Sequence, residues 1–156
     1  MKRLLIDLTK CRECKECEAL CGYYYHGNNR GVKKLIELAV FVTTCRKCED
    51  SPCVNVCPKE ALEKDENGIL QKHNNLCINC KSCVIACPFG TIPEFIFEYL
   101  ASACDYCNID EGTEELECVK SCPKGAIEIT EEEPDEKKHI YLITDKLLVK
   151  DYKWEE

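Results

Sequence analysis

The sequence has few of the residues that build a large aromatic core or a fibrous repeat. It contains 7 Gly, 6 Pro, 1 Trp and 1 Met, and aromatic side chains make up 8% of its 156 residues. A collagen-like chain needs far more glycine, and a disordered chain lacks the regular apolar runs seen here, so both classes are excluded. The hydrophobic content of 45% includes cysteine. Without cysteine it falls to roughly 35%, which is little for a chain of this length.

Long apolar runs and an excess of basic residues are also missing. The longest apolar segments, 35–42 and 95–100, contain Glu37 and Glu98 and are much shorter than the roughly 20 residues that span a bilayer. We therefore expect no direct membrane insertion. The apolar stretch near the start ends at Asp7, so we expect no secretory signal. The net charge of −8 would repel a phosphate backbone, and we expect no nucleic-acid partner.

Cysteine, in contrast, is abundant. The chain has 16 cysteines, about one residue in ten, a level typical of a disulfide scaffold or a metal-rich protein. Because no export signal is expected, the sequence predicts a cytoplasmic location, where thiols stay reduced. Sixteen reduced thiols indicate bound metal rather than eight disulfides.

The cysteines form four groups of four, and the groups are spaced alike. Each group begins with C-x2-C and ends with C-x3-C, while the middle gap is two, four, two and ten residues in groups one to four. Groups two, three and four end in Cys-Pro. Such a recurrence indicates internal duplication. In chain order the groups are Cys11, Cys14, Cys17, Cys21; Cys45, Cys48, Cys53, Cys57; Cys77, Cys80, Cys83, Cys87; and Cys104, Cys107, Cys118, Cys122.

This spacing suits [4Fe-4S] clusters. A short C-x2-C-x2-C loop can supply three of the four thiolates that a cubane needs. C-x3-C places the third and fourth cysteines on one helical face, about 6 Å apart in rise, which suits two adjacent clusters. In two-cluster ferredoxins the fourth cysteine binds the other cluster. The alternatives are weaker, because eight disulfides need an oxidising compartment and four-thiolate zinc sites do not use the C-x3-C endings. We predict four [4Fe-4S] clusters.

Three runs carry a resemblance to a known family: Cys45-Arg-Lys-Cys-Glu-Asp-Ser-Pro-Cys, Cys77-Ile-Asn-Cys-Lys-Ser-Cys-Val-Ile-Ala-Cys-Pro-Phe-Gly and Cys104-Asp-Tyr-Cys-Asn. Over about residues 3–130 the chain resembles the four-cluster, ferredoxin-like electron-transfer subunits of dimethyl sulfoxide reductase, carbon monoxide dehydrogenase, formate hydrogenlyase and tungsten aldehyde-oxidoreductase-type enzymes. Two features depart from the family pattern. Gly22 stands where proline usually follows the fourth cysteine, and group four carries an acidic insert at 108–117.

The resemblance implies a small α+β fold with a cluster-dominated core. The pairing of the cysteine groups predicts two nested units like bacterial dicluster ferredoxins. The resemblance also implies a non-catalytic subunit that relays electrons to or from a large catalytic oxidoreductase subunit of the tungsten or molybdenum class. A ferredoxin or a flavin subunit would be a second redox partner. A free polyferredoxin carrier and a zinc-binding interaction module are the alternatives.

Near copies and a turn signal indicate how the groups pair. Cys57-Pro-Lys-Glu-Ala-Leu-Glu and Cys122-Pro-Lys-Gly-Ala-Ile-Glu almost repeat each other, and Asn67-Gly68 predicts a hairpin before group three. We therefore expect an inner ferredoxin unit at 43–93 and an outer unit made of 1–42 and 94–130, with a C-terminal extension at 131–156. The sequential pairing, one with two and three with four, is the alternative.

The nested pairing predicts four ligand sets, in which each fourth cysteine serves the cluster of another group. These are cluster A with Cys11, Cys14, Cys17 and Cys122; cluster B with Cys104, Cys107, Cys118 and Cys21; cluster C with Cys45, Cys48, Cys53 and Cys87; and cluster D with Cys77, Cys80, Cys83 and Cys57.

The rest of the chain carries fewer signals. Apolar spacing predicts a helix at 33–42. Two short strands in the extension would either complete a hairpin on the cluster module or extend a partner's sheet. The acidic insert and the Tyr23–Tyr25 run are candidates for a partner interface, and the alternative is that both are ordinary surface loops. No catalytic motif is recognisable.

Overall fold

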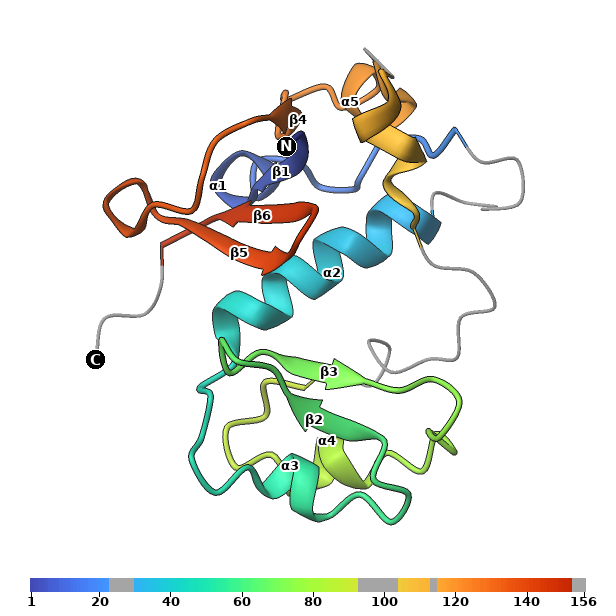
Figure 1. Ribbon diagram of the computed structural model, residues 1–156, viewed down its shortest axis with the longest axis vertical. Coiled ribbons are helices and arrows are strands. Elements are labelled where there is room, and N and C mark those ends of the chain that lie inside the picture. The colour runs from blue at the N-terminus through green and yellow to red at the C-terminus, as the bar shows by residue number, and fades with distance from the viewer. Residues whose placement is uncertain (23–29, 93–103, 113–114, 153–156) are drawn as a thin grey trace. The chain divides into compact units, whose positions relative to one another are not determined.

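The structure is a computed structural model that describes residues 1–22, 30–92, 104–112 and 115–152 (Figure 1). The chain divides into two compact units. Unit 1 comprises residues 1–43 and 102–156, and unit 2 comprises residues 44–101. Both contain helices and strands, so the expected α+β class is confirmed.

Unit 1 is built on a four-stranded sheet in the order β4-β1-β6-β5. Its strands are β1 (Arg3–Asp7), β4 (Ile127–Thr130), β5 (Ile140–Thr144) and β6 (Leu147–Lys150). β1 pairs antiparallel with β4 and parallel with β6. Every residue of β1 is buried, as expected for a central strand with a continuous apolar run. The strands of this sheet carry nine buried aliphatic side chains.

The C-terminal strands are part of this sheet. β5 and β6 form an antiparallel hairpin, and β6 lies next to β1 (Figure 1). Leu147, Leu148 and Val149 are completely buried. Of the two outcomes that the sequence left open for this segment, the structure therefore has the hairpin on the cluster-bearing module.

Three helices and two 3-10 helices complete the described part of unit 1. Asp7 caps α1 (Leu8–Cys11) by accepting a hydrogen bond from the Thr9 amide. α2 (Arg30–Thr44) confirms the helix predicted at 33–42. The others are η3 (Tyr106–Glu111) and α5 (Glu117–Lys120), and the 3-10 turn η4 (Glu136–Lys138) precedes β5. Within the described residues, no helix is long and apolar enough to cross a bilayer.

Unit 2 is smaller and has less aliphatic core. It contains α3 (Pro52–Asn55), the antiparallel strands β2 (Leu62–Lys64) and β3 (Leu70–Lys72), and α4 (Ser82–Ala86). The turn between the strands is the predicted hairpin: the Gly68 amide bonds to the Asp65 carbonyl at 2.9 Å. Among its described residues, the buried apolar side chains are Ala61, Leu62, Ile69, Leu70 and Ile92. Unit 2 therefore needs something besides aliphatic packing to hold its loops.

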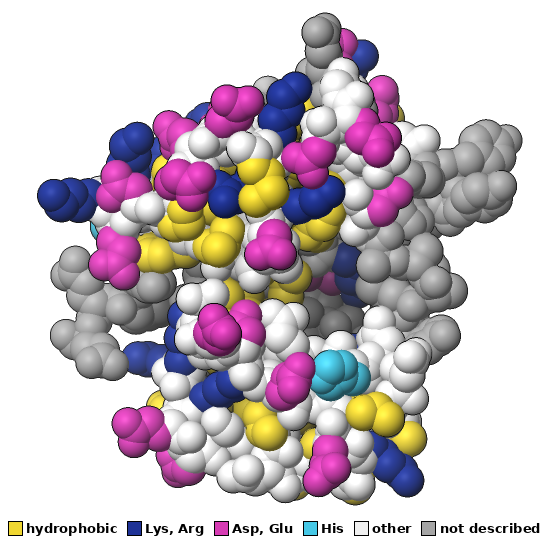
Figure 2. All heavy atoms as spheres, viewed as in Figure 1, with side chains coloured by type: hydrophobic (Ala, Val, Ile, Leu, Met, Phe, Trp, Pro, Cys, Tyr) yellow, Lys and Arg dark blue, Asp and Glu magenta, His cyan; other side chains and the backbone are white. Residues whose placement is uncertain are grey.

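Charged side chains of both signs are mixed over the visible face of the protein, with apolar side chains between them (Figure 2). Large apolar residues at the surface include Ile78, Ile85 and Phe89 of unit 2 and Leu20 of unit 1. Scattered apolar side chains are normal on a protein surface. They carry functional weight only where they border a site.

Candidate functional site

All sixteen cysteines lie in described parts of the chain and all are free thiols. Cys17 and Cys80 are exposed, and the other fourteen are half-buried. They sit on short helices and on the loops beside them, at the rim of each unit's core. Thiols near the surface and outside disulfides are available to bind a metal group.

One cavity of unit 1 is lined by cysteines from two groups that lie far apart in the sequence. Cys11, Cys14 and Cys17 of group one share it with Cys122 of group four. The β1–β4 pairing explains this meeting, since α1 follows β1 directly and Cys122 lies just before β4. Two hydrogen bonds hold the same junction: Asp7 amide to Ala126 carbonyl at 2.7 Å and Lys10 Nζ to Gly125 carbonyl at 3.2 Å.

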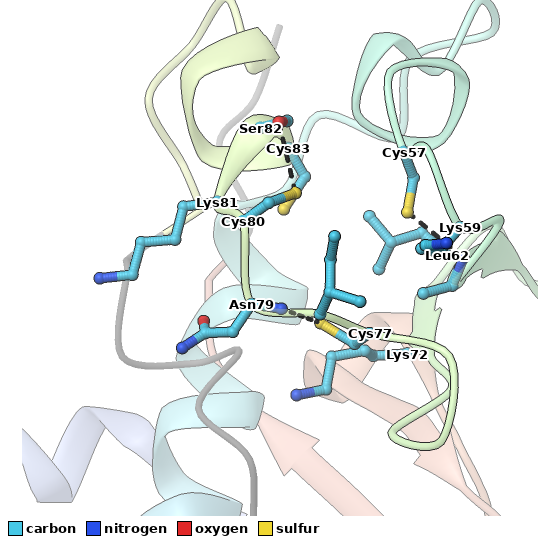
Figure 3. Close-up of a pocket in the computed structure, with 12 residues that line it drawn as sticks. Cys57, Lys59, Leu62, Lys72, Cys77, Asn79, Cys80, Lys81, Ser82 and Cys83 are labelled. Carbon is cyan, nitrogen blue, oxygen red and sulfur yellow. Dashed lines mark hydrogen bonds between the residues drawn. The ribbon is translucent and has the colours of Figure 1, made fainter.

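A second cavity, in unit 2, repeats this arrangement. Cys77, Cys80 and Cys83 of group three line it together with Cys57 of group two. Figure 3 shows Cys57 on one side of the cavity and the other three cysteines on the loop and helix opposite. Cys57 follows α3 and Cys83 lies on α4, and these two helices pack against each other. Ala61, Leu62 and Ile78 supply an apolar lining.

Backbone amides point at several of the sulfurs. The Ala61 and Ala126 amides donate to the sulfurs of Cys57 and Cys122, each at 3.3 Å. The two near-copy segments thus form the same local structure. The Asn79 and Tyr106 amides donate in the same way to Cys77 and Cys104, each at 3.4 Å. Such bonds stabilise a thiolate and tune the potential of a cluster bound to it.

Left-handed backbone accompanies these loops. Lys47, Asn79 and Tyr106 each precede the second cysteine of a C-x2-C pair and have φ of 52°, 57° and 60°. Non-glycine residues seldom adopt this conformation, and its cost is accepted mainly at functional sites. In group one the corresponding stretch continues from α1 instead.

The electrostatics of the thiols favour the binding of a positively charged group. Burial raises the pKa of Cys11 to about 11, and the neighbouring Cys122, Cys17 and Cys14 thiolates add to the effect. Burial likewise raises the pKa of Cys118 to about 12, with further increases from Cys104, Cys107 and Cys21. Four thiolates cannot share such a space without a compensating positive charge. Iron would supply that charge and release the thiol protons.

Groups two and three also meet at a second place in unit 2. The Arg46 guanidinium, next to Cys45, lies 5.6 Å from the ring centre of Phe89, two residues after Cys87. Lys64 Nζ donates a hydrogen bond to the Cys48 carbonyl. Among the described residues, no group of three or more His, Cys, Asp or Glu side chains converges closely enough to hold one metal ion.

Sequence reasoning missed one ion pair beside these loops. Arg12, next to Cys11, donates to both carboxylate oxygens of Asp151 at 2.7 and 2.6 Å. The Asp151 side chain is 2% exposed and that of Arg12 is 62% exposed. No sequence signal joins positions 139 residues apart, and only the parallel β1–β6 pairing brings them together.

The acidic insert is anchored to unit 1. Ile109 is completely buried. Asp110 forms an ion pair, 2.9 Å long, with Lys146, which lies in the turn between β5 and β6. Glu115 pairs with Lys120 at 2.6 Å. Tyr23–Tyr25, the other candidate for a partner interface, lies outside the described residues, and the role of both segments at an interface stays a prediction.

Comparisons with known proteins agree with this geometry. The 4Fe-4S dicluster domain family matches residues 36–132, and a 4Fe-4S binding domain matches residues 8–24. The Escherichia coli (strain K12) protein YsaA is 35% identical over 144 residues, covering 82% of this chain and 89% of that protein. Electron transport protein HydN from the same strain is 31% identical over 156 residues, covering 81% and 87%. YnfG of that strain, a probable anaerobic dimethyl sulfoxide reductase subunit, is 32% identical over 156 residues, covering 86% and 75%. The chain therefore belongs to the family of 4Fe-4S dicluster-domain electron-transfer proteins.

Proposed function

We propose that this chain holds four [4Fe-4S] clusters and relays single electrons to or from a larger oxidoreductase subunit. One observation carries the proposal: two separate cavities are each lined by three cysteines of one group and the fourth cysteine of another. This is the ligand exchange that defines two-cluster ferredoxins. Four such sets in one chain would form a path for single-electron steps.

Two of the proposed ligand sets rest on these cavities. Cluster A takes Cys11, Cys14, Cys17 and Cys122, and cluster D takes Cys77, Cys80, Cys83 and Cys57. These are the cysteines that line the cavities of unit 1 and unit 2. The amide bonds to Cys57 and Cys122 support a ligand role for the fourth cysteine in each set.

The other two sets rest on proximity. Cluster B takes Cys104, Cys107, Cys118 and Cys21. Burial raises the pKa of Cys104 and Cys118 most, and the charge of a Cys21 thiolate raises both further, which supports its place beside them. Cluster C takes Cys45, Cys48, Cys53 and Cys87, which is supported by the contact between Arg46 and Phe89. In this assignment the inner ferredoxin unit, 43–93, holds clusters C and D, and the outer unit, 1–42 with 94–130, holds A and B.

The partner is proposed from the relatives. YnfG is by its name part of a dimethyl sulfoxide reductase, and we propose a catalytic partner of the molybdenum or tungsten class for the present protein. A ferredoxin or flavin subunit would exchange electrons at the other end of the path. Sixteen cysteines without disulfides support a reducing compartment, the cytoplasm.

Two measurements test the cluster count and the partner. Protein purified without oxygen should contain about 16 iron and about 16 acid-labile sulfide per chain. About 8 iron, or stoichiometric zinc, would contradict four clusters. Purification from the native host should bring along a large molybdenum or tungsten subunit. A protein that purifies alone, fully loaded with iron, would instead be a free polyferredoxin.

A matched pair of variants tests the ligand exchange. Cys57→Ser should damage the cluster held by Cys77, Cys80 and Cys83, and Cys87→Ser should damage the cluster held by Cys45, Cys48 and Cys53. Each variant serves as the control for the other, because both remove the last cysteine of a group in unit 2. Damage confined to the mutated group, seen by electron paramagnetic resonance of each reduced cluster, would refute the exchange.

A further inference from the structure

The cysteine-lined cavity of unit 2 has an unusual charge for this acidic protein. Three lysines line it, Lys59, Lys72 and Lys81, and no carboxylate is among the described residues that do so. The corresponding cavity of unit 1 has one lysine, Lys15, together with Glu16 and Glu18. The protein as a whole carries a net charge of −8. The positive rim therefore distinguishes the cavity of unit 2 from that of unit 1.

The same rim is open to solvent and partly apolar. Cys80 is one of the two exposed cysteines of the protein. Ile78, between Cys77 and Cys80, is 58% exposed although it lines the cavity. Figure 3 shows Lys81 extending from the Cys80 loop away from the cysteines. An exposed apolar side chain bordered by polar and charged groups is a common composition of a docking surface.

From this juxtaposition we infer that the rim formed by Lys59, Lys72, Lys81 and Ile78 docks a small acidic electron-carrier protein. The inference rests on the proposed electron-transfer function, because it assigns cluster D as the place where electrons enter or leave. Charge complementarity indicates the kind of partner. The basic rim of this cavity would attract the acidic face of a carrier, and the excess negative charge of the present protein would disfavour docking elsewhere.

The lysines would act mainly on encounter. Their side chains reach the surface from different elements, with Lys59 after Cys57, Lys72 on β3 and Lys81 at the start of α4. Lys59 is exposed, and Lys72 and Lys81 are half-buried. Charges at a rim accelerate association at low salt and lose their effect as ions screen them, while Ile78 would exclude water at the contact. A carrier held there would lie against the Cys80 edge of the cluster.

The test compares two variants with the same change in charge. Lys59→Glu/Lys81→Glu reverses the rim, and Lys137→Glu/Lys138→Glu reverses two lysines of η4 in unit 1. Electron exchange with an acidic bacterial-type ferredoxin would be followed by stopped-flow absorbance, without oxygen, at several salt concentrations. We expect the rim variant to be at least ~10-fold slower at low salt and to approach the unmodified protein at high salt, with the η4 variant much less affected.

Two further measurements keep the outcome clear. Lys59→Gln/Lys81→Gln removes the charge without introducing repulsion and should show a smaller loss in the same direction. Iron content and electrochemical reduction at an electrode report whether the clusters are present and redox-active without any carrier. If the electrode detects no redox-active clusters even in the unmodified protein, the proposed function fails. The docking inference is overturned if the clusters are active and the rim variant exchanges electrons as fast as the η4 variant. It is also overturned if the rim variant loses binding of the large catalytic subunit but keeps its exchange with the carrier.

Discussion

The ion pair between Arg12 and Asp151 is expected to stabilise the loop that carries Cys11, Cys14 and Cys17, and the loss of one partner should cost more than the loss of the other. Asp151 is buried and depends on Arg12 for its counter-charge, whereas Arg12 is largely in solvent. Arg12→Ala therefore leaves a carboxylate buried without its partner. Asp151→Asn leaves an arginine that can turn into water, and an asparagine oxygen can still accept the hydrogen bond from the Tyr152 amide, which is 2.9 Å long in the native protein.

The magnitudes follow from the burial of each partner. Removing one partner of a fully buried pair costs about 3–5 kcal/mol, and the 62% exposure of Arg12 lets water reach the site, so we expect about 2 kcal/mol for Arg12→Ala. For Asp151→Asn we expect about 1 kcal/mol, the usual worth of a hydrogen bond. The double variant should be less damaging than Arg12→Ala alone, because no charge is left uncompensated.

The assay follows the loss of visible cluster absorbance in urea, without oxygen, as a rate, since unfolding that releases clusters is irreversible. A loss of about 2 kcal/mol corresponds to roughly 30-fold faster release if the pair is already broken in the transition state of the rate-limiting step. Glu13→Gln is the control in the same loop, because the Glu13–Lys124 pair at 3.2 Å is exposed on both sides and should cost less than about 1 kcal/mol. If Arg12→Ala behaves like Glu13→Gln, or if Asp151→Asn is the worse of the two, the reasoning is wrong.

The backbone at Gly125 and the uneven core of the two units give the remaining predictions. Gly125 has φ of 58° and no atom within 4 Å of the position of an added Cβ, so Gly125→Ala should cost about 1 kcal/mol through the backbone alone. Glu60 holds the same place in the near copy with φ of 49° and provides the control, since Glu60→Ala should leave the rate of cluster release in urea nearly unchanged. Removal of the clusters should unfold unit 2 before unit 1, because the described part of unit 2 buries few aliphatic side chains while β1 and β6 bury theirs completely or nearly so. Hydrogen exchange of the iron-free protein should then show residual protection in β1, β4 and β6 and none in 44–92, and equal protection in both units would count against this view.

The sequence by itself determined the chemistry of this protein. Sixteen cysteines with repeated C-x2-C and C-x3-C spacing indicated [4Fe-4S] clusters, because the reach of a short loop and the pitch of a helix are local properties. The hairpin at Asn67-Gly68 and the helix at 33–42 were predictable for the same reason, since turn chemistry and apolar periodicity act over a few residues.

Only the tertiary structure decided which distant segments meet. The β1–β6 pairing makes the C-terminal hairpin part of the core of unit 1 and brings Asp151 to Arg12, and neither contact leaves a pattern in the sequence. The three lysines around the cavity of unit 2 come from three separate segments of the chain, so their common location cannot be recognised from spacing. Strand pairing and loop packing depend on interactions between residues far apart in the sequence, and these are the interactions that local sequence rules do not contain.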